Sequence, residues 1–218
     1  VRWQHPQRGQ QCPTNFINIL EESGLIVEVG IWILDEACRA FGQLLREGLI
    51  DPEHFSLCVN ISPRQFRQTH FVEHVQRSLL THQVPFSMLK LEITEGIMIQ
   101  NLEDTIAKMH QLTALGVSFA MDDFGTGYSS LTHLKRLPVD ALKIDQSFVR
   151  DAIHDPNDAE IIRAVVAMAL SLKLKVVAEG VEQPAQLAFL QSLDCHVYQG
   201  FLHSEPLPLA GFRALLAK

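Results

Sequence analysis

Hydrophobic residues along the chain follow two alternating patterns: short continuous apolar runs, and longer stretches in which apolar positions recur every three or four residues. The first pattern is typical of a buried β-strand and the second of an amphipathic helix. Strands are predicted over residues 55–62, 88–95, 117–124, 139–145, 174–180 and 196–200. Helices are predicted over residues 13–24, 32–48, 70–83, 102–116, 128–137, 158–172, 184–193 and 207–217.

Residues typical of helix ends support several of these bounds. Thr14 or Asn15 is expected to cap the first helix, because a short polar side chain can accept a hydrogen bond from the free amides of a first turn. Gly24, Gly48 and Gly116 are expected to end the first, second and fourth helices, since glycine readily adopts the left-handed conformation found there.

The alternation of strands and helices predicts an α/β fold with a parallel sheet. A doubly wound open sheet and a (β/α)8 barrel both fit this order. The barrel usually takes about 250 residues, and the chain has 218. A barrel without its opening strand would be about this long, so both architectures remain open on these grounds. No linker or low-complexity segment divides the chain, which favours one domain.

Each predicted strand has an acid, an amide or a lysine at or just beyond its C-terminal end. These residues are Asn60, Glu92, Glu95, Asp122, Asp123, Lys143, Asp145, Glu179, Glu182 and Gln199. A single such acid is most often a helix cap or a turn former. In a parallel barrel, however, the strand ends converge on one rim, where active sites are built. The recurrence at six strand ends therefore favours a site.

So many carboxylates at one rim would repel one another and take up protons unless a cation neutralised them. Carboxylate and amide oxygens suit a hard divalent ion, Mg²⁺ or Mn²⁺, better than zinc or copper. The acids are numerous enough to bind two ions, and paired ions commonly promote in-line attack at phosphorus. The rim is therefore predicted to be a metal site for phosphoryl chemistry.

The composition and net charge of the chain limit the kinds of molecule that it is expected to bind. The chain is 47% hydrophobic and 20% charged, which allows a sizeable core, and its net charge is −7. This charge argues against a nucleic-acid polymer or an anionic membrane as the main partner. A small phosphorylated ligand remains compatible, because a bound divalent ion inverts the local field. Without a signal peptide or an apolar span of about 18 residues, the chain is expected to be soluble and not to insert into a membrane.

The four cysteines are scattered and form no CxxC pair. Cys12, Cys38, Cys58 and Cys195 are interpreted as reduced packing residues of a cytosolic protein, because neither a disulfide frame nor a zinc site fits this spacing.

Eight motifs carry a resemblance to a known family. In chain order they are RWQHP, EESGLI, VNIS, LEITEG, DDFGTGYSSL, LKIDQSFV, VAEGVE and QGF. With these motifs the chain resembles the EAL domain, a bacterial phosphodiesterase module that hydrolyses cyclic di-GMP to linear 5′-pGpG. The resemblance covers residues 1–218 and implies a TIM-like (β/α)8 barrel whose first strand is missing from this chain. It also implies that the chain is the C-terminal domain of a longer protein.

The resemblance implies a role for each rim residue. The metal ligands would be Asn60, Glu92, Asp122, Asp123 and Glu179, holding two Mg²⁺ or Mn²⁺ ions. The catalytic residues would be Lys143, Glu179, Glu182 and Asp123. The substrate would be bound by Arg2, Asp145 and Gln199, and Glu95 would hold the DFGTGYSS loop in its working shape. Gly125 and Gly127 would let that loop bend close to the metal.

The chain also departs from the family pattern. The signature Glu of the family would lie just before Val1, and the N-terminus is expected to have been cut there. His203 and Glu205 stand where the family usually has an aromatic residue and a lysine. An inactive EAL domain that binds cyclic di-GMP as a receptor is therefore the alternative to an enzyme. The resemblance further suggests a cytoplasmic homodimer controlled by upstream sensory or GGDEF domains.

Overall fold

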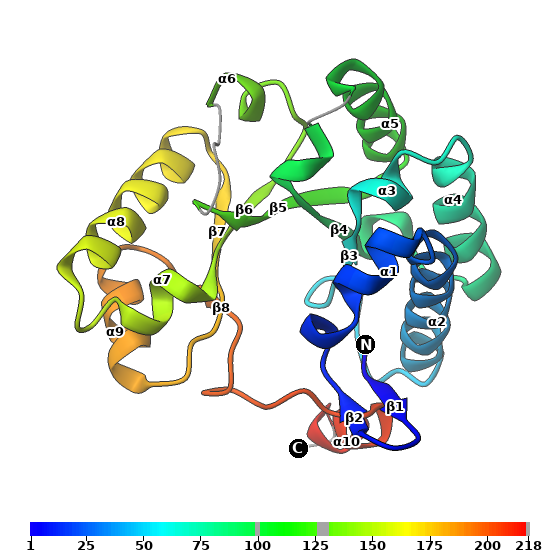
Figure 1. The fold of residues 1–218 in the computed structure, drawn as a ribbon, viewed down its shortest axis with the longest axis horizontal. Helices are drawn as coiled ribbons and strands as arrows, with labels where there is room; N and C mark the ends of the chain where they lie inside the picture. Colours follow the sequence, from blue (N-terminus) through cyan, green and yellow to red (C-terminus); the bar gives the residue numbers. More distant parts are fainter. Residues whose placement is uncertain (99–100, 126–130, 217–218) are drawn as a thin grey trace.

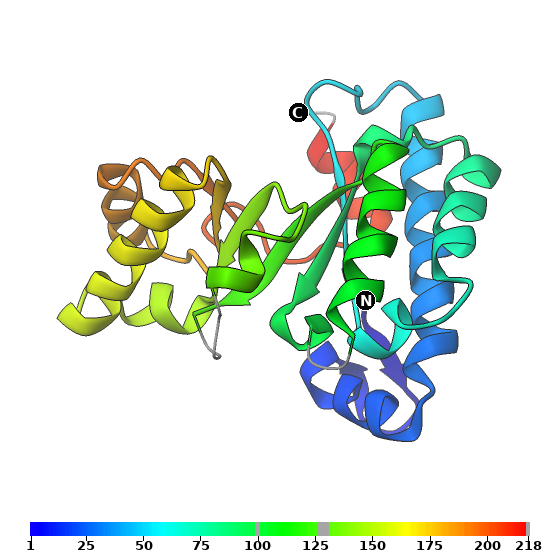
Figure 2. The same ribbon diagram turned by 90° about the horizontal axis from the view of Figure 1, so that it is seen from above.

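A six-stranded parallel sheet forms the centre of the computed structural model, which describes residues 1–98, 101–125 and 131–216. The strands are β3 (Leu57–Ile61), β4 (Leu89–Thr94), β5 (Ser118–Phe124), β6 (Ala141–Ile144), β7 (Lys175–Ala178) and β8 (Val197–Tyr198). They lie in chain order, each parallel to the next. The sheet curls into a half-barrel with the helices outside it (Figures 1 and 2). The predicted barrel architecture is confirmed over these six strands.

The helices that cover the sheet account for most of the remaining chain. The long ones are α2 (Ile26–Arg46), α4 (Phe71–His82), α5 (Leu102–Ala114), α8 (Pro156–Ser171) and α9 (Pro184–Ser192). The shorter ones are α1 (Ile17–Ser23), α3 (Pro63–Phe66), α6 (Leu131–Leu134), α7 (Gln146–Asp151) and α10 (Leu209–Leu216). Single 3₁₀ turns are η1 (Pro13–Asn15), η2 (Phe86–Met88) and η3 (Glu95–Met98).

Alternation along the strands separates the core from the site. In β4, Leu89, Leu91 and Ile93 are fully buried against the helical layer, whereas Lys90 and Glu92 point to the opposite, concave face. The parallel register continues this division across the sheet, because paired residues share a face. Burial of the apolar face provides most of the driving force for folding. The concave face is left free for polar side chains.

Several predicted elements required correction. Phe16, not Thr14 or Asn15, is the N-cap residue of α1, because residues 13–15 form a separate 3₁₀ turn. Helix α2 begins at Ile26, about two turns before the predicted start at residue 32. Glycines end these helices as predicted: Gly24 has φ +80° and Gly48 φ +67°.

Several short elements besides the 3₁₀ turns were not predicted. They are the antiparallel hairpin of β1 (Trp3–His5) and β2 (Gly9–Gln11), helix α3 and helix α7. Elements of three to six residues are too short to show a hydrophobic period. Residues 126–130, which include most of the GTGYSS loop and the start of the helix predicted over 128–137, lie outside the described residues.

The cysteines divide into two classes. All four are free, and Cys38 and Cys195 are buried as expected. Cys12 and Cys58 are exposed, which corrects their interpretation as packing residues. Cys58 lies on β3, at an edge of the described sheet, and pairs with Lys90 on the concave face. Within the described part of the chain, no helix has both the length and the apolar character to cross a membrane.

Candidate active site

A buried lysine lies at the centre of the concave rim. Lys143, on β6, is 3% exposed. Its Nζ lies 2.6 Å from Glu92 Oε2, 3.0 Å from Asp122 Oδ1 and 2.5 Å from Glu179 Oε1. These partners come from β4, β5 and the end of β7. The strand register therefore brings four predicted site residues into one ion-pair cluster.

The charges of this cluster depend on one another. Burial by itself disfavours the ammonium form of Lys143, but the surrounding carboxylates outweigh it and raise the lysine pKa above its usual value. Burial raises the pKa of Glu179, and the attraction of Lys143 opposes that rise. A buried charge whose partner is removed costs several kilocalories per mole. The lysine and the carboxylates are therefore coupled.

Asp122 and Asp123 reach the same site because β5 bulges. Met121 pairs with Leu142 and Phe124 with Ile144, so two residues of β5 stand opposite the single Lys143. Asp123 has φ +52°, a left-handed conformation that is uncommon outside glycine. Its backbone N–H donates to Asp122 Oδ1 at 3.1 Å. In a regular strand these neighbours would point to opposite faces.

Three carboxylates come close enough to hold an ion. One oxygen each of Asp122, Asp123 and Glu179 lies within 4.8 Å of the others. The pKa of Asp123 is raised to about 6 by burial and by the nearby charges of Asp122 and Asp145. Repulsion of this kind is relieved by a bound cation. An all-oxygen ligand set suits Mg²⁺ or Mn²⁺.

Asp145 has a structural role as well as a place at the rim. It is the N-cap residue of α7, and its Oδ1 accepts from the backbone N–H of Ser147 at 2.8 Å and from the Ser147 hydroxyl. A side-chain cap of this kind fixes the start of the helix. The capping interpretation of a strand-end acid is therefore correct for Asp145, although its carboxylate also raises the Asp123 pKa.

The remaining strand-end residues surround this cluster. Asn60 is exposed and pairs with Glu92 in the sheet register. Glu182 lines a cavity of about 320 Å³ together with Asp145. Gln199 continues the ladder beyond β8, donating its backbone N–H to Ala178 O at 2.8 Å. Burial raises the pKa of Glu95, which begins η3.

The loop that Glu95 was expected to hold falls mostly outside the described residues, as does Gly127, so both roles stay predictions. Gly125 is described: it has φ +101°, and a Cβ added there would lie 3.0 Å from the Phe148 ring. A glycine is therefore required at the end of β5, in agreement with the sequence.

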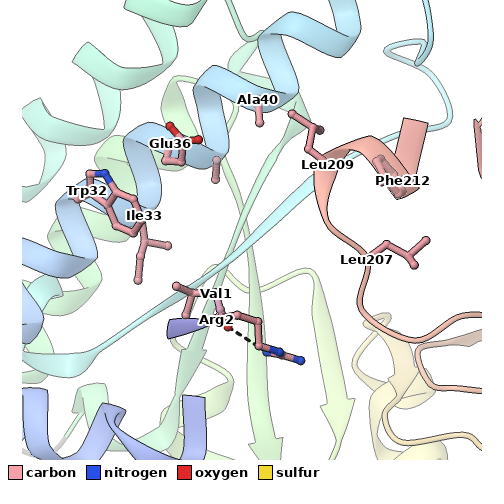
Figure 3. A pocket seen from close by; sticks show the side chains of 10 residues that line it. Val1, Arg2, Trp32, Ile33, Glu36, Ala40, Leu207, Leu209 and Phe212 are labelled. Carbon is pink, nitrogen blue, oxygen red and sulfur yellow. Dashed lines mark hydrogen bonds between the residues drawn. The ribbon is translucent and has the colours of Figure 1, made fainter. Parts of the chain in front are cut away.

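Arg2 lies in a different environment. Its guanidinium donates to Val1 O at 2.9 Å. It lines a cavity of about 490 Å³ with apolar side chains, among them Trp32 of α2 and Leu207 before α10 (Figure 3). None of the described residues that line this cavity belongs to the acidic rim. The substrate-binding role of Arg2 stays a prediction. His203 and Glu205, the departures from the family pattern, are both exposed.

Sequence reasoning missed three residues of α7 that line the second cavity. Gln146, Ser147 and Arg150, all on α7, line the cavity of about 320 Å³ with Asp145 and Glu182. The signal was the stretch Asp-Gln-Ser directly after β6, which has the form of a helix cap. A short helix after a parallel strand carries its residues to the same rim.

Comparison with known proteins agrees with this architecture. The family model described as EAL domain matches residues 1–206. The Pseudomonas aeruginosa bifunctional diguanylate cyclase/cyclic di-GMP phosphodiesterase MucR is 44% identical over 217 residues, covering 100% of this chain and 31% of MucR. The cyclic di-GMP phosphodiesterase NbdA of the same organism is also 44% identical, covering 99% of this chain and 27% of NbdA. This chain thus spans under a third of either relative.

Solved structures show the same fold. A structure described as the PaMucR phosphodiesterase in complex with c-di-GMP superposes with a TM-score of 0.91 at 44% identity. The superposition covers 97% of this chain and 84% of that one. The EAL enzyme Bd1971, in its cAMP- and cyclic-di-GMP-bound form, gives a TM-score of 0.93 at 33% identity, covering 99% of this chain and 58% of that one.

Proposed function

Since the chain belongs to the EAL domain family, we propose that it is a metal-dependent phosphodiesterase that hydrolyses cyclic di-GMP to linear 5′-pGpG. The observation that carries the proposal is the buried Lys143, which contacts Glu92 and two members of the Asp122–Asp123–Glu179 cluster. A buried lysine among several carboxylates, placed at the carboxyl ends of parallel strands, is typical of a catalytic site. The names of MucR and NbdA support the choice of substrate.

The donor set fits a hard divalent ion. Asn60, Glu92, Asp122, Asp123 and Glu179 all offer oxygen ligands, and we propose that they hold two Mg²⁺ or Mn²⁺ ions. When bound, the ions supply Lewis acidity that activates water and stabilises charge on the reacting phosphate. The close approach of three carboxylates and the raised pKa of Asp123 support this assignment.

The residues of the chain supply the other parts of the reaction. The Lys143 ammonium provides fixed positive charge where the transition state gains negative charge on phosphate oxygens. Asp123 lies beside Asp122 and Asp145 at the rim, where it would help to hold the metal and the attacking water. Glu179 and Glu182 would orient the attacking water, and Asp145 and Gln199 would contact the substrate at the rim.

The alternative function is a receptor that binds cyclic di-GMP without hydrolysing it. The observation that motivates this alternative is Glu205, an exposed acid at a position where the family usually has a lysine. A carboxylate there repels the phosphates of the ligand and would hold the in-line geometry less firmly. The same rim would then serve for recognition only.

A turnover assay separates the two functions. The chain is incubated with cyclic di-GMP and Mn²⁺, and 5′-pGpG is measured by chromatography. We expect product that disappears with EDTA and falls at least 100-fold in Glu179→Gln, because the substitution removes a negative ligand at nearly constant volume. The control Glu73→Ala, an exposed acid of α4, should leave turnover within twofold. Binding measured by calorimetry without any product would reject the enzyme and support the receptor.

Assembly and cellular context belong to the same proposal. We infer a homodimer, upstream sensory or GGDEF domains, and a cytoplasmic location. The short span of this chain relative to MucR and NbdA supports further domains in the parent protein. Sedimentation of the chain with and without cyclic di-GMP tests the dimer directly.

A further inference from the structure

The segment that follows β7 carries two predicted catalytic acids, and its backbone is fixed only in part by the sheet. The Glu179 N–H donates to Ile144 O at 3.1 Å, and the Val181 N–H donates to Gln199 O at 3.1 Å. These bonds tie the segment to the ends of β6 and β8. The next two amides, of Glu182 and Gln183, lie beyond this ladder and before the first turn of α9.

A buried glutamine of α9 binds both of these amides. Gln186 is 3% exposed. Its Oε1 accepts from the N–H groups of Glu182 and Gln183 at 2.8 and 2.9 Å. Its Nε2 donates to Val149 O and Arg150 O, near the end of α7, at 3.2 and 3.3 Å. One carboxamide thus accepts from two backbone N–H groups at the start of α9 and donates to two backbone carbonyls near the end of α7.

The two elements joined by Gln186 both contribute site residues to the lining of one cavity. Asp145 caps the N-terminus of α7, and the segment after β7 carries Glu182; both residues line the cavity of about 320 Å³. The walls approach closely at Gly180, where an added Cβ would lie 2.6 Å from Gln146 Cβ. The hydrogen bonds of Gln186 join α7 to the segment after β7 outside this cavity.

We propose that Gln186 is a positioning residue that sets Glu182 against α7 and Asp145, and so determines the geometry of this side of the rim. The inference rests on the proposed phosphodiesterase function. Gln186 acts through the backbone N–H of Glu182 and through the carbonyl groups of α7. An interpretation in which Gln186 only caps α9 predicts a loss of stability with unchanged kinetics per folded molecule.

The test compares Gln186→Met, which keeps the length of the side chain and removes the amide, with Ser78→Ala. Ser78 is a matched control, because it is also buried and its hydroxyl joins two elements, donating to Asp35 Oδ1 at 3.0 Å between α4 and α2, away from the rim. Folded fractions are measured by circular dichroism at the assay temperature. Steady-state kinetics with Mn²⁺ are then expressed per folded molecule, and amide exchange is measured at residues 182 and 183.

We expect Gln186→Met to lower kcat/KM per folded molecule at least tenfold and to accelerate exchange at Glu182 and Gln183 at least tenfold. Ser78→Ala should change both by less than twofold. The inference is overturned if Gln186→Met keeps kcat/KM within twofold, or if Ser78→Ala loses as much as Gln186→Met.

Two further outcomes are covered. If Gln186→Met does not fold, Gln186→Glu replaces it: this variant keeps the two acceptor contacts and loses the two donor contacts to α7. A folded Gln186→Glu with unchanged kcat/KM also overturns the inference. If the unsubstituted chain shows no turnover, the proposed function fails, and the inference is judged on the dissociation constant of cyclic di-GMP, which should rise at least tenfold in Gln186→Met alone.

Discussion

Lys143 and Arg2 are two cationic residues with opposite surroundings. Lys143 is 3% exposed and contacts three carboxylates from neighbouring strands. Arg2 is exposed, donates to the adjacent carbonyl and lines an apolar cavity between α2 and the C-terminal segment (Figure 3). The partners of Lys143 are set by the hydrogen-bond register of the sheet. The hydrogen bond of Arg2, by contrast, goes to the carbonyl of the adjacent residue. The sheet register therefore gathers the predicted partners of Lys143 around it. The substrate-binding role of Arg2 rests on the family resemblance alone.

The largest expected effect is at Lys143. Lys143→Met leaves Glu92, Asp122 and Glu179 without their common cation, so the free energy of unfolding should fall by about 3–5 kcal/mol. Urea unfolding at pH 7 without divalent metal measures the loss. Lys175→Met, at an exposed position of β7, is the control and should change stability by less than about 0.5 kcal/mol. An equal loss in both variants would contradict the central role of Lys143.

A second effect is expected at Gly180. This residue has φ +68°, and an added Cβ would lie 2.6 Å from Gln146 Cβ. Gly180→Ala should therefore destabilise the chain by about 1–3 kcal/mol, through backbone strain and overpacking. Gly9 also has positive φ, +66°, but a Cβ there meets nothing within 4 Å. Gly9→Ala therefore measures the backbone strain without the steric clash. The thermal midpoint should fall further in Gly180→Ala than in Gly9→Ala.

A third prediction concerns pH. The pKa of Asp123 is raised to about 6 in the folded chain, from a usual value near 4. Between these values the folded state binds more protons than the unfolded state, so stability falls as pH rises through the window and the loss is complete above about 6. Urea unfolding without metal at pH 4.5 and 7 should show this decline. Asp123→Asn should reduce it, whereas Asp194→Asn, at an exposed carboxylate, should not.

The smallest effect on stability is expected at Arg2. Arg2→Ala removes only an exposed side chain and should change the free energy of unfolding by less than about 0.5 kcal/mol. If Arg2 contacts a substrate phosphate, as the family resemblance predicts, the KM for cyclic di-GMP should rise at least fivefold with little change in kcat. An unchanged KM would contradict the substrate-binding role of Arg2.

The sequence was sufficient for the strands and for most of the rim. Six apolar runs were long enough to be recognised, and each was followed by polar residues at the point where it ended. Parallel strands place these ends together by geometry, which is why Asn60, Glu92, Lys143 and Glu179 could be grouped before any coordinates were known. Sequence reasoning did not find the short elements β1, β2, α3 and α7. They are only three to six residues long, too short to show a hydrophobic period.

The arrangement inside the rim required tertiary structure. Alternation predicts that Asp122 and Asp123 point to opposite faces; the bulge opposite Lys143 and the left-handed conformation of Asp123 bring both carboxylates near Glu179. The bonds of Gln186 to α7 join residues 36 and 37 positions apart. The sequence by itself determined which residues lie at the rim, because each apolar run ends in polar residues and the ends of parallel strands lie together. Only the folded chain decided which of them touch, because register, bulges and helix ends are fixed by packing between distant segments.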